Sequence, residues 1–77
     1  MAGEEVKRIE ELIEVILRSI PKEREARNLY RQTAARAPNE MARLLFERLS
    51  EQEAVHEQKL RAVLELLRAE KREIESR

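Results

Sequence analysis

Four acidic or imidazole side chains stand where the apolar seam of a long helix would otherwise continue. They are Glu23, Glu53, His56 and Glu70. Burying an unpaired carboxylate costs on the order of several kcal/mol, so such groups need a partner or a bound cation. Carboxylates suit Fe²⁺, Fe³⁺ and Mn²⁺, and an imidazole favours a first-row transition metal over Mg²⁺ or Ca²⁺. Glu70 lies close to the end of the chain, where we expect water to hydrate it.

Glu53 and His56 form a Glu-x-x-His pair and therefore share one face of a helix. A lone core histidine is more often structural than a ligand, and His56 could simply hydrogen-bond Glu53. The position of Glu23 favours a metal site instead, because Glu23 lies fifteen residues before Pro38 and Glu53 fifteen residues after it. At 1.5 Å per residue each lies roughly 22 Å from a turn at Pro38, so an antiparallel hairpin places the two carboxylates side by side.

The strongest break in the helical pattern is the segment Ala37-Pro38-Asn39. Proline disfavours helix at the residue before it and cannot continue a helix, and Asn39 can cap the helix that follows. We therefore predict an all-α fold in a single domain spanning 1–77, with helices over about 4–36 and 40–75 and a turn over 37–39. Such a short connection makes the two helices antiparallel neighbours.

Pro21 complicates the first helix, which it should either kink or split, with Ser19 as the cap of the second piece. The apolar spacing favours a kinked but continuous helix, because heptad steps of three and four run straight across the proline. The inward positions predicted for the first helix are Val6, Ile9, Ile13, Ile16, Ile20, Glu23, Arg27, Tyr30, Ala34 and Ala37. Those predicted for the second helix are Phe46, Leu49, Glu53, His56, Leu60, Val63, Leu67, Glu70 and Ile74.

The composition agrees with long helices that need a partner. Of the 77 residues, 42% are apolar and 42% are charged, with sixteen basic and sixteen acidic side chains. One hairpin leaves its apolar seam open, so we expect at least a dimer that forms a four-helix bundle. Mixed charge and the lack of a long apolar run predict a cytoplasmic protein without a nucleic-acid or membrane partner. The absence of cysteine excludes disulfides, thiolate zinc sites and iron–sulfur clusters from this chain.

A two-fold axis close to the level of Glu23 would bring together four glutamates and two histidines. This is the ligand set of di-iron carboxylate bundles, and binding requires ionised carboxylates and a neutral imidazole. Tyr30 follows Glu23 by seven residues on the same face, either as core filler or with its hydroxyl reaching a ligand carboxylate. Other glutamates flank this level, and we expect them to be mostly solvated surface. They are Glu25, Glu47, Glu51 and Glu57.

Two segments resemble the metal-binding helices of rubrerythrins. The stretch from Glu23 to Tyr30 has the pattern E-x-x-A-x-x-x-Y, and the stretch from Glu53 to His56 has the pattern E-x-x-H, with an apolar run from Met41 to Leu49 between them. The resemblance covers roughly 16–67, and the architecture is similar to that of encapsulated ferritins. It implies a half-bundle whose ligands are Glu23, Glu53 and His56, with Tyr30 near them. It also implies ferroxidase activity in a ring of dimers inside an encapsulin shell.

The sequence thus predicts a ferroxidase that oxidises Fe²⁺ at a di-iron site shared across a homodimer, for iron storage or detoxification. Glu23 and His56 would be terminal ligands and Glu53 a bridging ligand, with manganese as the alternative metal. One alternative is a non-catalytic assembly module in which the buried Glu and His residues fix the register. Another is a rubrerythrin-like peroxidase with an external electron donor, since the chain has no cysteine-ligated iron of its own.

Overall fold

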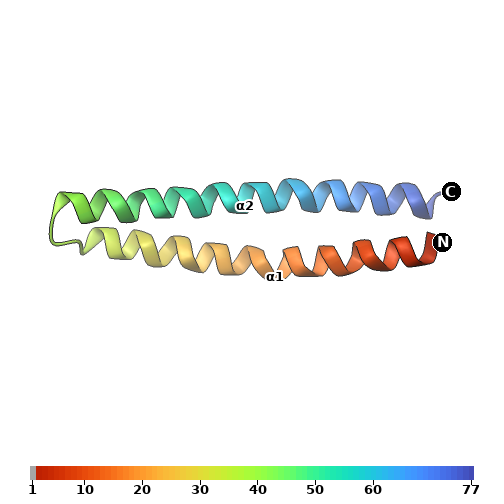
Figure 1. Cartoon of the computed structure of the whole chain (residues 1–77), viewed down its shortest axis with the longest axis horizontal. Helices are drawn as coiled ribbons and strands as arrows, with labels where there is room; N and C mark the ends of the chain where they lie inside the picture. The colour runs from red at the N-terminus through yellow and green to blue at the C-terminus, as the bar shows by residue number, and fades with distance from the viewer. Residues whose placement is uncertain (1) are drawn as a thin grey trace.

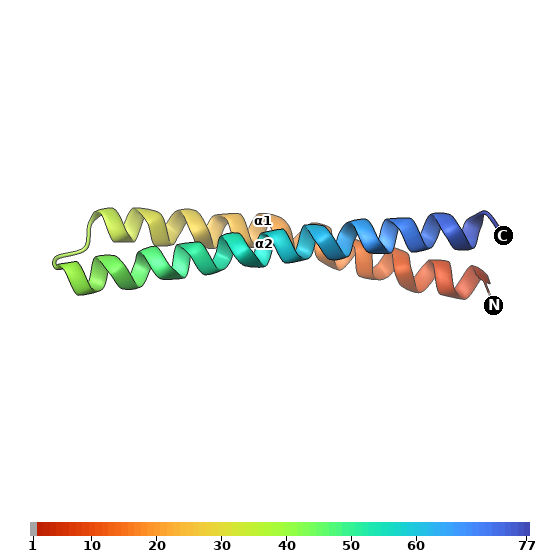
Figure 2. The same ribbon diagram turned by 90° about the horizontal axis from the view of Figure 1, so that it is seen from above.

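The fold is a pair of long helices, seen in a computed structural model that describes residues 2–77. Helix α1 (Ala2–Ala35) and helix α2 (Glu40–Glu75) are joined by a short turn. They run antiparallel, so both termini lie at the end opposite the turn (Figure 1). The hairpin is a rod with extents of 58 × 15 × 12 Å, and the helices cross near its middle (Figure 2). The prediction of an all-α helical hairpin is confirmed.

The turn is built by the residues that the sequence singled out. The backbone N–H of Ala37 donates to the carbonyl of Ala34 at 3.2 Å, which closes the end of α1. Asn39 has an extended backbone, and its side-chain oxygen accepts a hydrogen bond from the N–H of Ala42 at 2.8 Å. A cap of this kind stabilises a helix start by about 1 kcal/mol, because it satisfies an otherwise unpaired amide.

Helix α1 runs unbroken through Pro21. Proline has no N–H to give to the carbonyl of Leu17, so one bond of the helix ladder is missing there. The hydroxyl of Ser19 donates a hydrogen bond to the carbonyl of Val15, one turn earlier in the same helix, at 2.8 Å. Ser19 therefore lies inside α1 and does not cap a second helix. The continuous helix that the apolar spacing favoured is the one that forms.

The core is thin and one-sided. Its centre is Ile16, Ile20 and Leu64, with Ile13, Leu60 and Leu67 packed against them. Within residues 2–77 no large side chain is fully buried, and ten large apolar side chains are at least 44% exposed. Two helices cannot enclose a core between them, so a substantial apolar surface remains open.

Helix α2 meets α1 along a central stripe and one flanking edge. The stripe consists of Glu53, Leu60, Leu67 and Ile74. The flanking edge that is buried or half-buried against α1 is called the inner edge here and consists of Glu57, Leu64 and Lys71. The edge on the other flank of the stripe is exposed, is called the outer edge, and consists of His56, Val63 and Glu70.

This rotation differs from the predicted seam, which turned the outer edge toward α1. Both edges combine with the same stripe in a heptad pattern, so the apolar spacing alone does not separate them. Leu64 is 5% exposed whereas Val63 is 44% exposed. The prediction that Glu57 is solvated surface is also wrong, because Glu57 is only 9% exposed. Glu70 is exposed, as expected.

Candidate metal centre

Three of the four predicted site residues converge midway along the hairpin. Glu23 comes from α1, and Glu53 and His56 come from α2 one helical turn apart. Each offers one ligand atom, and these atoms all lie within 4.8 Å of one another. The convergence follows from the equal distances of Glu23 and Glu53 from the turn, together with the (i, i+3) spacing on α2.

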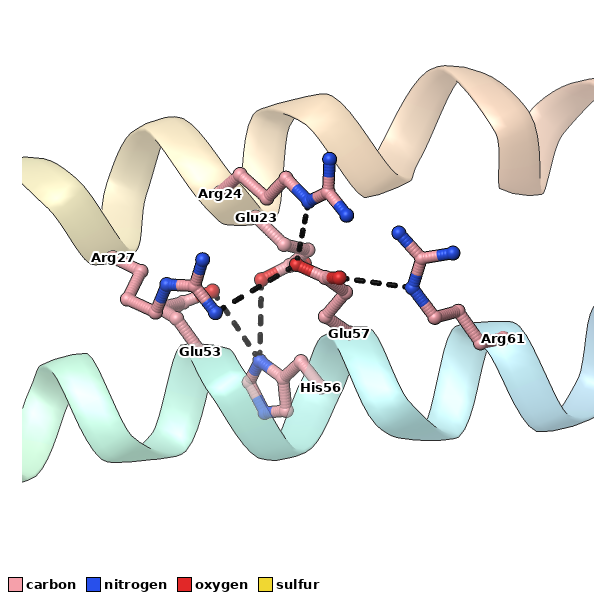
Figure 3. A network of polar contacts seen from close by, with 7 residues as sticks. All are labelled: Glu23, Arg24, Arg27, Glu53, His56, Glu57 and Arg61. Atoms are coloured by element: carbon pink, nitrogen blue, oxygen red, sulfur yellow. Dashed lines mark hydrogen bonds and ion pairs between the residues drawn. The ribbon is translucent and has the colours of Figure 1, made fainter.

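The imidazole of His56 turns one nitrogen back toward both carboxylates. Its Nδ1 lies 3.5 Å from Oε2 of Glu23 and 3.6 Å from Oε2 of Glu53 (Figure 3). The carboxylate side chains are 26% and 18% exposed, whereas the histidine side chain is 53% exposed. The cluster is therefore closed on the α1 side and open on the outer edge of α2.

A shallow groove of about 400 Å³ begins at this open side. It is lined by Ile16, Glu23, His56, Lys59, Leu60 and Val63. Its floor combines core side chains of both helices with the exposed Val63 of the outer edge. The candidate ligands therefore lie at the end of a shallow depression whose exposed surface is largely apolar.

A second polar cluster lies against the first on the inner edge. The Glu57 carboxylate accepts hydrogen bonds from Nε of Arg24 at 3.1 Å and Nε of Arg61 at 2.9 Å, and a guanidinium nitrogen of Arg27 lies 3.9 Å away. Figure 3 shows the three guanidiniums around this one carboxylate. Arg24, followed by Arg61, holds the pKa of Glu57 below its usual value. We call these four residues the arginine clamp.

Sequence reasoning missed the arginine clamp, although two signals pointed to it. Glu57 and Arg61 have the (i, i+4) spacing of a helical ion pair. Arg27 occupies a seam position, where its charge needs an acidic partner from the other helix. The Nε atom of Arg27 is buried and has no hydrogen-bond partner. Arg27 is thus half-buried at the helix interface, and Glu57 is the acidic side chain of α2 that lies near its guanidinium.

Tyr30, the fourth predicted site residue, packs as an aromatic core residue. Its ring centre lies 6.3 Å from that of Phe46, with the ring planes tilted by 36°. This pair sits between the turn and the carboxylate cluster and is half-buried. The tilted geometry is a favourable one for two aromatic rings and closes the hairpin on the turn side of the candidate ligands.

Comparison with known proteins assigns the chain to a family. The family model for rubrerythrin matches residues 14–77. The chain belongs to the rubrerythrin family. The match contains all four predicted site residues, and it spans most of the hairpin. No curated protein and no solved structure matches the chain.

Rubrerythrin proteins typically bind iron, and many are oxidoreductases. The donor set of this hairpin fits that preference, because two carboxylates and one imidazole are suitable ligands for a first-row metal. Neither helix within residues 2–77 has a stretch that is both long and apolar enough to cross a membrane. In this rubrerythrin hairpin the candidate ligands are held by the middle of two long helices, which are rigid supports for a site.

Proposed function

We propose that two copies of this rubrerythrin chain pair to build a di-iron carboxylate centre that oxidises Fe²⁺. The observation that carries the proposal is the gathering of Glu23, Glu53 and His56 ligand atoms within 4.8 Å. Three ligands from one hairpin are too few for two metal ions. Two copies related by a two-fold axis supply four carboxylates and two imidazoles, the set used by ferritin-like bundles.

The open side of the cluster supports pairing at this face. His56 is the most exposed of the three candidate ligands, and the groove beside it is lined largely by apolar side chains. A second hairpin seated there would cover Val63 and bring its own three ligands to the same level. We base the homodimer, and its further assembly into a ring of dimers inside an encapsulin shell, on the resemblance to encapsulated ferritins.

The protein residues have separate roles in this reaction. Glu23 and His56 would be terminal ligands of the iron, Glu53 would be a bridging ligand, and the carboxylates would neutralise the cationic charge. Bound iron supplies one-electron redox chemistry. Each of two Fe²⁺ ions gives up one electron, and O₂ takes both electrons and two protons to leave as H₂O₂. Storage or detoxification of iron is the physiological use that we propose for this oxidation.

A structural role is the second candidate, and one observation favours it. Nδ1 of His56 already lies 3.5 and 3.6 Å from two carboxylates, so these three side chains can be one another's partners without any metal. The cluster would then specify how two helical hairpins pair, as buried polar residues do in coiled coils. This candidate predicts that Fe²⁺ changes neither the stability nor the chemistry of the protein.

Titration of the purified, metal-free protein with Fe²⁺ under nitrogen, followed by exposure to O₂, separates the two candidates. For a metal centre, Fe²⁺ at about 100 times its dissociation constant raises the stability by about 2.7 kcal/mol per site, and oxidation is faster than in buffer. Glu53→Gln should abolish both effects, because it removes one carboxylate from each copy. Glu51→Gln, an exposed change two residues away, is the matched control. A wild-type protein that neither binds nor oxidises Fe²⁺ would overturn the ferroxidase proposal.

A further inference from the structure

The rotation of α2 about its own axis is not explained by apolar packing. The central stripe of α2 can form a heptad seam together with either edge. Each edge has an apolar residue at the same level, which is Leu64 on the inner edge and Val63 on the outer edge. Turning α2 by about 50°, roughly half a residue position, would exchange the two edges and keep the central stripe in the heptad seam. A specific polar interaction is therefore needed to select one rotation.

The arginine clamp provides that selection. Glu57 contacts both Arg24 and Arg27 of α1, and it is the only buried charged residue within the described part of the chain. If α2 turned its outer edge inward, the Glu57 carboxylate would move away from α1 and leave the half-buried Arg27, whose Nε atom is buried, without this anion. The Glu57 carboxylate is buried in this interface, so the loss of its arginine partners on α1 is unfavourable, and these contacts favour a single rotation of α2.

That setting decides where His56 points. Glu57 is the next residue along α2, so its capture by α1 turns His56 about 100° away, toward the groove. From there Nδ1 meets Glu23 and Glu53 from the open side. With the opposite rotation the imidazole would lie between the helices, where a second hairpin has no access to it.

We propose that Glu57 is a positioning residue for the metal centre, which sets the rotation of α2 through Arg24 and Arg27 and so presents His56 to the shared site. The part of this inference that concerns the metal rests on the proposed function. The part that concerns rotation does not, and it can be measured in metal-free protein.

Methyl nuclear Overhauser effects report the rotation directly. In metal-free protein with labelled Ile, Leu and Val methyl groups, diluted into unlabelled protein, Leu64 should contact Ile20 because both belong to one buried cluster. In Glu57→Gln the Leu64–Ile20 contact should weaken and a Val63–Ile20 contact should appear. Arg24→Gln, a change at a half-exposed arginine, should shift the pattern in the same direction if Glu57→Gln does not fold.

Co²⁺ binding, followed by visible absorption, reports the metal site. Substitution of a residue that orients a ligand typically weakens metal binding by roughly 10- to 100-fold, and we expect at least tenfold for Glu57→Gln, with an altered absorption spectrum. Glu10→Gln is the matched control, because it removes another contact between the helices, Lys71–Glu10 at 3.4 Å, far from the site. It should leave both the spectrum and the affinity within about twofold of the wild type.

The outcomes separate the inference from the proposed function. An unchanged Leu64–Ile20 contact in Glu57→Gln and Arg24→Gln overturns the inference, whatever the metal does. A shifted contact with unchanged Co²⁺ binding overturns the positioning role. A wild-type protein that binds no Co²⁺ overturns the proposed function together with the positioning of a metal ligand, and the methyl contacts then decide the rotation alone.

Discussion

The inner and outer edges of α2 lie one residue apart along the same helix but have opposite environments. On the inner edge, Glu57 is 9% exposed and surrounded by three guanidiniums, and Leu64 is 5% exposed. On the outer edge, the His56 side chain is 53% exposed and Val63 is 44% exposed. The inner edge is thus paired and covered within one hairpin, whereas the outer edge keeps exposed apolar area and an imidazole that is open to a further contact.

The comparison shows how one hairpin separates folding from site assembly. All four residues of the arginine clamp belong to a single chain. The clamp can therefore fix the rotation of α2 against α1 without a metal ion or a second copy. The candidate ligands are left with free coordination capacity on the opposite side. Polar groups that are already fully paired make poor metal ligands, so pairing the arginines with Glu57 leaves Glu23 and Glu53 available for a cation.

A charge placed on the outer edge should have the largest effect. In the proposed homodimer, Val63→Asp would bury two added carboxylates, and we expect the dimer dissociation constant to rise by about 1,000-fold, or ~4 kcal/mol. Leu17→Asp is the control, since Leu17 is 46% exposed and lies seven residues before Arg24, on the flank of α1 that carries the clamp. Sedimentation equilibrium measures both. Dissociation by Leu17→Asp alone would place the second copy on the clamp side.

Truncation of Leu64 on the inner edge should lower the free energy of unfolding more than truncation of Val63 on the outer edge. Leu64→Ala leaves a cavity in the central cluster and should lower the free energy of unfolding by about 3 kcal/mol. Val63→Ala removes fewer buried atoms and should cost about 1 kcal/mol. Urea unfolding of both variants at one protein concentration makes the comparison. Equal losses, or a larger loss for Val63→Ala, would contradict the rotation seen in the structure.

Much of the fold could be predicted because it depends on local chemistry. Pro38 ends the first helix because its ring cannot continue a helix, and Asn39 caps the second helix through its side-chain oxygen. Both effects are local and do not depend on tertiary contacts. The level of Glu23 beside Glu53 follows from counting residues back from that turn, because the rise per residue of a helix is constant. These two facts were enough to bring the three candidate ligands together.

The rotation of α2 could not be predicted from apolar spacing, because a heptad seam fits two neighbouring edges equally well. The deciding residues were charged, and charged side chains on a helix are usually solvated, which is why Glu57 was expected on the surface. Its burial depends on Arg24 and Arg27, which lie thirty or more residues earlier in the sequence. An arginine at a seam position, such as Arg27, is the sequence signal that predicts a buried acidic partner on the other helix, here Glu57.

Removal of the outer-edge imidazole should weaken metal binding less than removal of a bridging carboxylate. His56→Ala leaves four carboxylates in a dimer that can hold a hard cation loosely, so we expect roughly a tenfold loss of Fe²⁺ affinity, or ~1.4 kcal/mol. Gln58→Ala, an exposed change on the same helix, is the control. Anaerobic calorimetry measures both affinities. An unchanged affinity in His56→Ala would remove the histidine from the ligand set.

Acidification should lower the free energy of unfolding through Glu57 of the inner edge, and this effect should be smaller than those above. The pKa of the Glu57 carboxyl is lowered from 4.5 by Arg24 and Arg61. A carboxyl whose pKa is lower in the folded state contributes stability that is present above its unfolded pKa and is lost as pH falls through the folded pKa. The wild type should therefore lose this contribution below about pH 4.5, where protons compete with the arginines for Glu57.

Glu57→Gln has no carboxyl at this position to protonate, so it resembles the acid form of the wild type at every pH. Its free energy of unfolding should lie below that of the wild type at pH 7 and approach it as the pH falls, which makes its pH profile flatter. Glu25→Gln, an exposed change on α1, should run parallel to the wild type. Urea unfolding between pH 7 and pH 3 measures the three profiles. Parallel curves for Glu57→Gln and the wild type would mean that the arginine clamp does not stabilise the ionised carboxylate.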